Sequence, residues 1–276
     1  MENIIKKIIR SYNAGRRYLF KDTKYLFFYI YRYFTDNYHN KCKFYTDEEF
    51  ANLIKAGKPA LRLGDGEISL VHFLPTPSNS PQVYSDAIRN DFLKIIKNYS
   101  DDSKYIIGIP KAVNFTNAEL KKINRFEVCR QMKITYEMIF NKNAKYFDAF
   151  AFYKDGGFEK FILPHIKNKK VIIATNEENK KKIMDSKLSS KEYLYVTCGE
   201  KNTYEDRFRM QNEIINIIDK SGLPKDNFAI LMSAGLSKTI IHDMAGKGYQ
   251  LIDIGRGLEN YYAGISIEHL LTDKLY

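Results

Sequence analysis

The stretch Leu61-Arg62-Leu63-Gly64-Asp65-Gly66-Glu67 places two carboxylates two residues apart between glycines, directly after a short apolar segment. Its apolar start predicts a strand. If extended geometry persists, Asp65 and Glu67 share a face, and Gly66 lets a ligand approach the backbone closely. Two carboxylates directed at one point suit Mg²⁺ or Mn²⁺. A turn in which Asp65 caps the next helix and Glu67 is solvated fits the same spacing.

Outward from this stretch, strand and helix patterns alternate along the chain. Thr46-Asp47-Glu48-Glu49 has the form of a capping box, and it predicts a helix that Gly57 and Pro59 end. Further strands are expected over 105–109, 146–152, 171–174, 193–197, 228–232 and 250–254, and further helices over about 84–98, 117–140, 177–186, 204–220 and 236–246. The alternation favours an α/β fold, with a Rossmann-like, mostly parallel sheet covered by helices on both faces.

The positive charge is concentrated at the N-terminus. The 276 residues carry a net charge of +11, and residues 1–45 hold ten basic and three acidic side chains of the total. This predicts two parts: a basic, aromatic, amphipathic helical segment over 1–45, and a Rossmann-like domain over 46–276. The segment either packs on the domain with a solvated basic face or docks on an anionic membrane or a partner. A dimer contact is an equal alternative to a membrane contact.

Composition narrows the class and the location. With 44% hydrophobic and 28% charged residues the chain has the composition of a globular protein. Its three scattered cysteines and five histidines form no disulfide framework and no zinc spacing. The predicted location is the cytoplasm, with peripheral contact at the inner face of the cytoplasmic membrane left open by the basic segment.

A second turn after a predicted strand has the sequence Ser233-Ala234-Gly235-Leu236-Ser237-Lys238. A turn of small residues that opens a helix exposes backbone N–H groups, which can bind phosphate. The turn matches neither GxGxxG nor GxxxxGK[ST], so neither a dinucleotide site nor a P-loop is supported. A phosphate cradle and a plain connection remain equal alternatives.

Two more stretches follow strands. In Asp253-Ile254-Gly255-Arg256-Gly257-Leu258-Glu259, Arg256 could meet a phosphate and Glu259 could act as a general base. Asp253 is a second catalytic candidate, with a buried, hydrogen-bonded strand residue as the alternative. Asn202 and Tyr204 could contact a base or ribose, although a turn capped by Thr203 explains them equally well.

Several motifs in order resemble those of a bacterial family, the GT-D-type glycosyltransferases, once catalogued as a conserved domain of unknown function. The resemblance spans roughly residues 46–262 and rests on Arg62-Leu63-Gly64-Asp65-Gly66-Glu67, Gly108-Ile109-Pro110, Phe147-Asp148-Ala149-Phe150, Asn202-Thr203-Tyr204, Gly235, Asp243-Met244, Lys247-Gly248-Tyr249-Gln250 and Asp253-Ile254-Gly255. It implies a Rossmann-like domain that binds a nucleotide-diphosphate sugar through a divalent cation, with Asp65 and Glu67 as the D-x-E metal pair. The chain departs from the family pattern after Gly255. There, Arg256 replaces a frequent histidine, and Glu259-Asn260-Tyr261-Tyr262 replaces an acidic-aromatic run.

The sequence thus predicts a metal-dependent glycosyltransferase of the hexosyltransferase type. It would move a sugar from a nucleotide-diphosphate donor, a UDP-sugar in the simplest case, to a cell-surface glycan, glycoprotein or lipid-linked acceptor. The predicted site comprises Asp65 and Glu67 for Mn²⁺ or Mg²⁺; Arg62, Gly64, Gly66, Asn202, Tyr204, Ser233, Gly235, Lys238 and Arg256 for the nucleotide sugar; and Asp253 and Glu259 for catalysis. A non-catalytic basic protein that binds nucleic acid or membrane is the alternative from another class. Nucleic acid is disfavoured as a partner, because the basic charge is concentrated in residues 1–45 and not on the domain that follows them. A Rossmann-like methyltransferase is a weaker alternative, since the glycines of its cofactor loop are missing.

Overall fold

The computed structural model describes residues 41–71, 85–122, 126–153, 156–185, 193–201, 203–258 and 261. Within these ranges, strands form one sheet in the order β1-β4-β3-β2-β8-β7-β5-β6, and every neighbouring pair is parallel. The strands are β1 (Lys43–Phe44), β2 (Ala60–Arg62), β3 (Ile106–Ile109), β4 (Lys145–Asp148), β5 (Lys170–Asn176), β6 (Tyr193–Cys198), β7 (Phe228–Ser233) and β8 (Leu251–Asp253). The predicted α/β architecture with a parallel sheet is confirmed.

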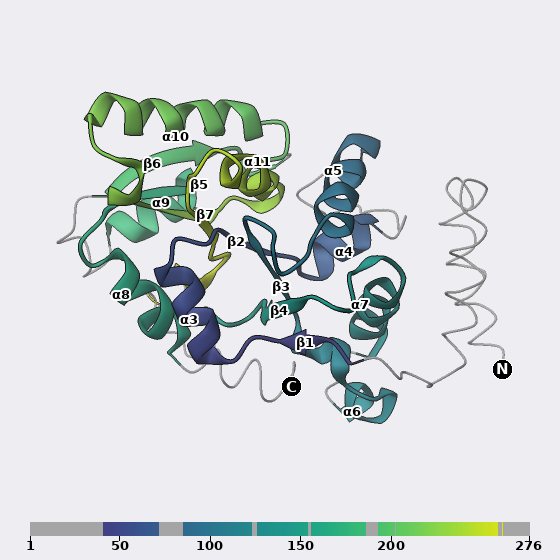
Figure 1. Ribbon diagram of the computed structural model, residues 1–276. Coiled ribbons are helices and arrows are strands. Elements are labelled where there is room, and N and C mark those ends of the chain that lie inside the picture. The colour runs from purple at the N-terminus through teal and green to yellow at the C-terminus, as the bar shows by residue number, and fades with distance from the viewer. Residues whose placement is uncertain are drawn as a thin grey trace.

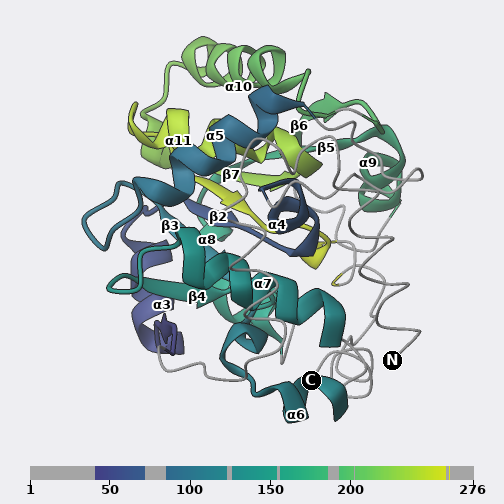
Figure 2. The ribbon, with the colours of Figure 1, turned by 90° about the vertical axis from the view of Figure 1, so that its right-hand side faces the viewer.

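Helices cover both faces of the sheet (Figures 1 and 2). The α-helices are α3 (Asp47–Lys55), α4 (Asp65–Val71), α5 (Asp86–Lys97), α6 (Asn117–Lys122), α7 (Phe126–Ile139), α8 (Leu163–Ile166), α9 (Glu177–Met184), α10 (Arg207–Ser221) and α11 (Ile240–Ala245). Shorter turns of helix are η1 (Lys111–Asn114), η2 (Phe158–Ile162), η3 (Lys225–Asn227) and η4 (Gly235–Thr239).

Strand alternation divides the core into two layers. Ile172 belongs to the buried cluster that includes residues of α4, α5, α7, α10 and α11, whereas its neighbour Ile173 belongs to the cluster that includes residues of α3, η2, α8 and α9. Both side chains are fully buried. Since successive strand residues point to opposite faces, the near-continuous apolar runs of the strands fill both layers at once.

Two elements differ from the sequence prediction near the candidate site. The predicted strand 146–152 ends early at Asp148, because the Asp148 carboxylate accepts a hydrogen bond from Phe150 N at 3.2 Å and its carbonyl accepts from Ala151 N at 2.8 Å, which closes a turn. The chain also becomes helical at Asp65, at the start of α4. Strand alternation therefore does not place Asp65 and Glu67 on one face.

The start of the domain follows the predicted capping box. Thr46 Oγ1 accepts from Glu49 N at 3.2 Å, and Glu49 Oε2 accepts from Thr46 N at 2.8 Å. Most of the predicted N-terminal segment, residues 1–40, lies outside the described residues. The last five residues of this segment, 41–45, are described. They contain β1, which joins the edge of the sheet beside β4, so the sheet begins before Thr46. In the described ranges no helix has both the length and the apolar character needed to cross a membrane.

The topology brings two strands from opposite ends of the domain together at the centre of the sheet. The chain continues from β2 to β3 and β4 on one side, whereas β7, β5 and β6 lie beyond β8 on the other side. Ligands of open α/β sheets bind outside the carboxyl ends of the strands at such a switch. The ends of β2 and β8, called the β2–β8 junction below, are therefore the expected place for a ligand.

His165 on α8 predicts a dependence of stability on pH. Burial, with a smaller contribution from the charge of Lys169, lowers its pKa to about 4. Between this pKa and the ordinary value near 6.5, the unfolded chain binds more protons than the folded chain, so the free energy of unfolding falls as the pH falls. We expect a loss of about 1 kcal/mol from pH 7 to pH 4.5, allowing for partial exposure of the ring. Urea unfolding of wild type and His165→Gln at both pH values measures it. An equal pH dependence in the two proteins would contradict the assignment to His165.

Candidate active site at the β2–β8 junction

Arg62 and Asp253 form the centre of the β2–β8 junction. Asp253, the last residue of β8, is 2% exposed. Its Oδ2 accepts from the backbone N of Arg62 at 3.2 Å, and its Oδ1 lies 3.4 Å from Arg62 Nη2. The adjacent strands thus end in an ion pair between buried Asp253 and nearly buried Arg62.

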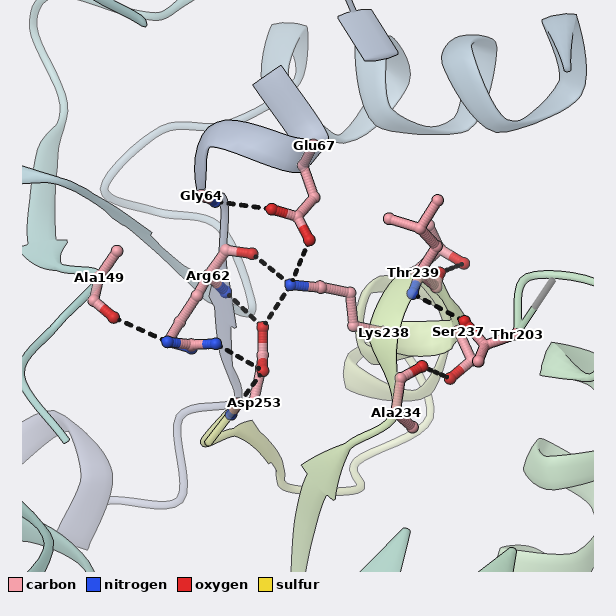
Figure 3. Close-up of polar contacts among 12 residues, drawn as sticks. Arg62, Gly64, Glu67, Ala149, Thr203, Ala234, Ser237, Lys238, Thr239 and Asp253 are labelled. Atoms are coloured by element: carbon pink, nitrogen blue, oxygen red, sulfur yellow. Dashed lines mark hydrogen bonds and ion pairs between the residues drawn. The ribbon is translucent and has the colours of Figure 1, made fainter. Parts of the chain in front are cut away.

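Lys238 joins this pair from the turn after β7, far in sequence from Arg62 (Figure 3). It lies on η4, and its side chain is 6% exposed. Its Nζ is 2.7 Å from Glu67 Oε1, 3.0 Å from Asp253 Oδ2 and 3.1 Å from the carbonyl oxygen of Arg62. An ammonium has three protons, so all of its donors are used.

Glu67 reaches Lys238 from the first turn of α4. Its second oxygen, Oε2, accepts from Gly64 N at 2.8 Å, while Ile68 N donates to the carbonyl of Gly64 at 3.1 Å. This is the return half of a capping box, in which the third helical residue bonds the N-cap backbone. A contact between residues three apart therefore helps to orient Glu67 toward Lys238.

Arg62, Lys238, Glu67 and Asp253, named the charge network here, contain two cations and two anions. Burial by itself would raise the pKa of Asp253, but the charges of Arg62 and Lys238 outweigh it and hold this pKa below its ordinary value. Burial would likewise lower the pKa of Lys238, yet Asp253 and Glu67 raise it. Asp253 and Lys238 thus remain charged at neutral pH, and by formal charge the two cations and two anions balance.

Tyr153 was missed by the sequence analysis and contacts the same network. Arg62 Nη1 donates to the carbonyl of Ala149 at 2.9 Å and also to Tyr153 Oη. The Tyr153 hydroxyl accepts a second bond from Arg256 N at 3.0 Å. Tyr153 directly follows the predicted strand over 146–152, and this position after a strand was the signal in the sequence that could have singled it out.

Gly255 allows the chain after β8 to pass close to these groups. Its φ is +48°, and a Cβ there would lie 1.9 Å from Arg62 Nη2 and 2.0 Å from Tyr153 Oη. Its N–H donates to Asp253 Oδ1 at 3.0 Å. Only glycine meets both the backbone and the space requirement at this position.

The turn from Ser233 to Lys238 uses much of its hydrogen-bonding capacity within the protein. Leu236 N donates to Thr203 Oγ1 at 3.0 Å, and Ser237 Oγ donates to the carbonyl of Ala234. Gly235 has a φ of +52°, and a Cβ there would lie 2.7 Å from Thr203 Oγ1. The turn therefore places Lys238 in the charge network and is anchored by Thr203.

The other predicted site residues are distributed as follows. Tyr204 is buried, donates to Asp91 Oδ2 at 2.6 Å and packs under the Arg207 guanidinium at 3.7 Å, so its phenol is engaged away from the charge network. Arg256 is exposed just after Gly255, and Gly66 is exposed on α4. Asn202 and Glu259 lie outside the described residues, and the described part of Asp65 is its backbone at the start of α4.

Carboxylate oxygens are the ligands that Mg²⁺ and Mn²⁺ prefer, so the chemistry of Asp65 and Glu67 fits such an ion. Within the described ranges, no group of three or more histidine, cysteine, aspartate or glutamate side chains is arranged to hold a metal. Both oxygens of Glu67 already have partners, in Gly64 N and Lys238 Nζ. A divalent ion at Glu67 would therefore share this carboxylate with a lysine.

Comparison with known proteins identifies the family. The model of a family described as glycosyltransferase GT-D fold matches residues 60–264, which include the whole charge network. The chain belongs to this glycosyltransferase family. Its members share the predicted fold, and the expected resemblance is confirmed.

Solved structures of the GT-D fold are similar over most of the chain. One is described as a new glycosyltransferase, from the domain of unknown function 1792, of Streptococcus sanguinis; it shows 18% identity, a TM-score of 0.65, and coverage of 82% of this chain and 86% of that one. A second, described as a highly conserved domain of unknown function 1792 with a distinct glycosyltransferase fold, shows 22% identity, a TM-score of 0.59, and coverage of 82% and 84%. A third, from the same domain family, shows 20% identity, a TM-score of 0.60, and coverage of 88% and 87%. No protein with a curated function matches the sequence.

Proposed function

We propose that this GT-D glycosyltransferase moves a hexosyl group from a nucleotide-diphosphate sugar, a UDP-sugar in the simplest case, to a hydroxyl group of its acceptor at the β2–β8 junction. The observation that carries the proposal is the balanced charge network of Arg62, Lys238, Glu67 and Asp253 at the switch in strand order. Buried charges with fixed partners make a preorganised polar site, which is suited to a reaction that develops charge on a diphosphate.

Asp65 and Glu67 would hold the Mn²⁺ or Mg²⁺ ion of this site. When bound, such an ion offsets the negative charge that develops on the departing diphosphate. Arg256, which is exposed beside the junction, would meet a phosphate oxygen. Gly66 leaves room at the start of α4 for a ligand to approach the backbone, whereas the space beside Gly64 is taken by the Glu67 carboxylate.

For Asp253 we propose a positioning role. A carboxylate whose pKa is held below the ordinary range by two buried cations is a poor proton acceptor at neutral pH. Asp253 instead orients Arg62 and Lys238 and fixes the turn at Gly255. Glu259 stays the candidate for the base that activates the acceptor hydroxyl.

The acceptor is proposed to be a cell-surface glycan, a glycoprotein or a lipid-linked intermediate. The lipid-linked case is motivated by the ten basic side chains of residues 1–45, since anionic headgroups attract lysine and arginine. Transfer would then take place at the inner face of the cytoplasmic membrane.

The test is donor turnover by the full chain, measured as release of nucleoside diphosphate from a panel of UDP-sugars, with and without Mn²⁺. We expect wild-type turnover that chelation removes, and a fall of at least about 100-fold in the double variant Asp65→Asn with Glu67→Gln. The reason is that the variant keeps the size of both side chains but removes two negative charges from the ion's ligands.

A matched control is the double variant Asp219→Asn with Asp226→Asn. Both aspartates are exposed and precede β7, so they lie at the opposite edge of the parallel sheet. This control is expected to keep wild-type turnover. Undiminished turnover of the Asp65 and Glu67 variant, with its fold verified by circular dichroism, would refute the metal assignment.

A further inference from the structure

The position of Lys238 bears on how the site binds a divalent ion. We infer that the Lys238 ammonium occupies the cation position beside Glu67, so that a divalent ion binds there in competition with this lysine. Lys238 is then a positioning residue that weakens metal affinity and makes the bound ion exchangeable. The inference rests on the proposed metal-dependent transfer.

The geometry supports an occupied cation position. Lys238 Nζ is surrounded by oxygens of Glu67, Asp253 and Arg62 at 2.7, 3.0 and 3.1 Å. Its side chain is 6% exposed, and it reaches the junction from η4, a segment remote in sequence from Glu67. The fold thus supplies a cation with a full set of oxygen partners, in the place where two carboxylates converge.

A second cation on the same oxygen would be close to the first. A divalent ion bound to Glu67 Oε1 at the usual distance of about 2.1 Å, with Nζ 2.7 Å from that oxygen, puts the two charges within about 5 Å. Repulsion at this separation is little screened where the side chains are nearly buried. Binding of the ion therefore favours release of Glu67 by Lys238.

The network permits this release without breaking its other contacts. When the Lys238 ammonium moves away from Glu67, it retains its ion pair with Asp253 and its hydrogen bond to the Arg62 carbonyl. Asp253 retains the hydrogen bonds that it accepts from the backbone N–H groups of Arg62 and Gly255. Glu67 keeps its bond to Gly64 N. Its side chain is also the more open one, at 13% exposed against 4% for Asp253. Glu67 is therefore the partner that a cation from solvent can take.

The test is the affinity of the full chain for Mn²⁺ alone, without a sugar donor, by isothermal titration calorimetry and by the loss of the free Mn²⁺ signal in electron paramagnetic resonance. Lys238→Met removes the charge and keeps a straight apolar side chain of similar length. We expect it to bind Mn²⁺ at least about tenfold more tightly than wild type. Lys238→Arg keeps the charge and is expected to stay at or near wild-type affinity.

Further variants keep the result interpretable. Lys238→Gln also lacks the charge but can still donate hydrogen bonds to Asp253 and Glu67. It replaces Lys238→Met in the experiment if that variant does not fold, and the same increase in Mn²⁺ affinity is expected. Adding Glu67→Gln to either neutral variant is expected to abolish the gain. Equal or weaker Mn²⁺ affinity in a folded neutral variant, or no Mn²⁺ binding to it at all, would overturn the inference.

Donor turnover separates the two proposals. Mn²⁺-dependent turnover without a gain in affinity refutes only the competition, whereas a gain in affinity without sugar turnover refutes only the transferase proposal.

Discussion

Asp253→Ala is expected to lower the free energy of unfolding by about 3–5 kcal/mol, because it leaves the buried charges of Arg62 and Lys238 without their shared anion. It also removes the acceptor for two backbone N–H groups, those of Arg62 and Gly255. Urea unfolding at pH 7, followed by circular dichroism, measures the change. Donor turnover should fall together with stability, since Arg62 and Lys238 lose the group that orients them.

Exposed Asp219, on the helix α10, is the control for this experiment, and its alanine variant should change the free energy of unfolding by less than about 0.5 kcal/mol.

The contribution of Asp253 to the stability of the wild-type protein also has a defined pH dependence. Its folded pKa lies below the unfolded value, so the stability it adds is present above about pH 4 and is lost as the pH falls through the folded pKa. A loss below about 1 kcal/mol for Asp253→Ala would show that the charge network is not desolvated.

Gly255→Ala is expected to destabilise the protein by about 3 kcal/mol or more and to impair sugar transfer. Its backbone has a φ of +48°, which costs a residue with a Cβ about 1–2 kcal/mol. The added methyl would also fall 1.9 Å from Arg62 Nη2 and 2.0 Å from Tyr153 Oη. Both groups are held by other partners, so moving them away breaks part of the charge network.

Gly222→Ala is the matched control, because Gly222 has a similar φ of +67° and no atom within 4 Å of the place that a Cβ would take. It is expected to cost only the backbone term of about 1 kcal/mol and to leave turnover unchanged. The difference between the two variants, by urea unfolding and donor turnover, isolates the close approach at the junction. Equal losses of stability and turnover in the two variants would mean that the side chains of Arg62 and Tyr153 move away from the added methyl group without a loss of free energy.

Much of the fold was predictable because its signals are local. The capping box at Thr46 formed as expected, and apolar runs such as 171–174 became central strands. The prediction of strand 146–152 was too long, since the side chain of Asp148 closes a turn whose hydrogen bonds apolar patterning does not report. The helix from Asp65 was expected only as the alternative in which Asp65 caps it, because the main prediction continued the strand geometry through Glu67. In the structure the Glu67 carboxylate completes the helix start at Gly64 N.

By itself, the sequence determined the alternation of strands and helices and the order of the motifs along the chain. These depend on periodicity, capping and turn chemistry within a few neighbouring residues. Only the tertiary structure decided which residues meet. Lys238 donates to the carbonyl of Arg62, 176 positions away, and Asp253 pairs with Arg62 across 191 positions. Such contacts arise because the parallel sheet sets β2 beside β8, and no local pattern specifies which charges then share one buried place.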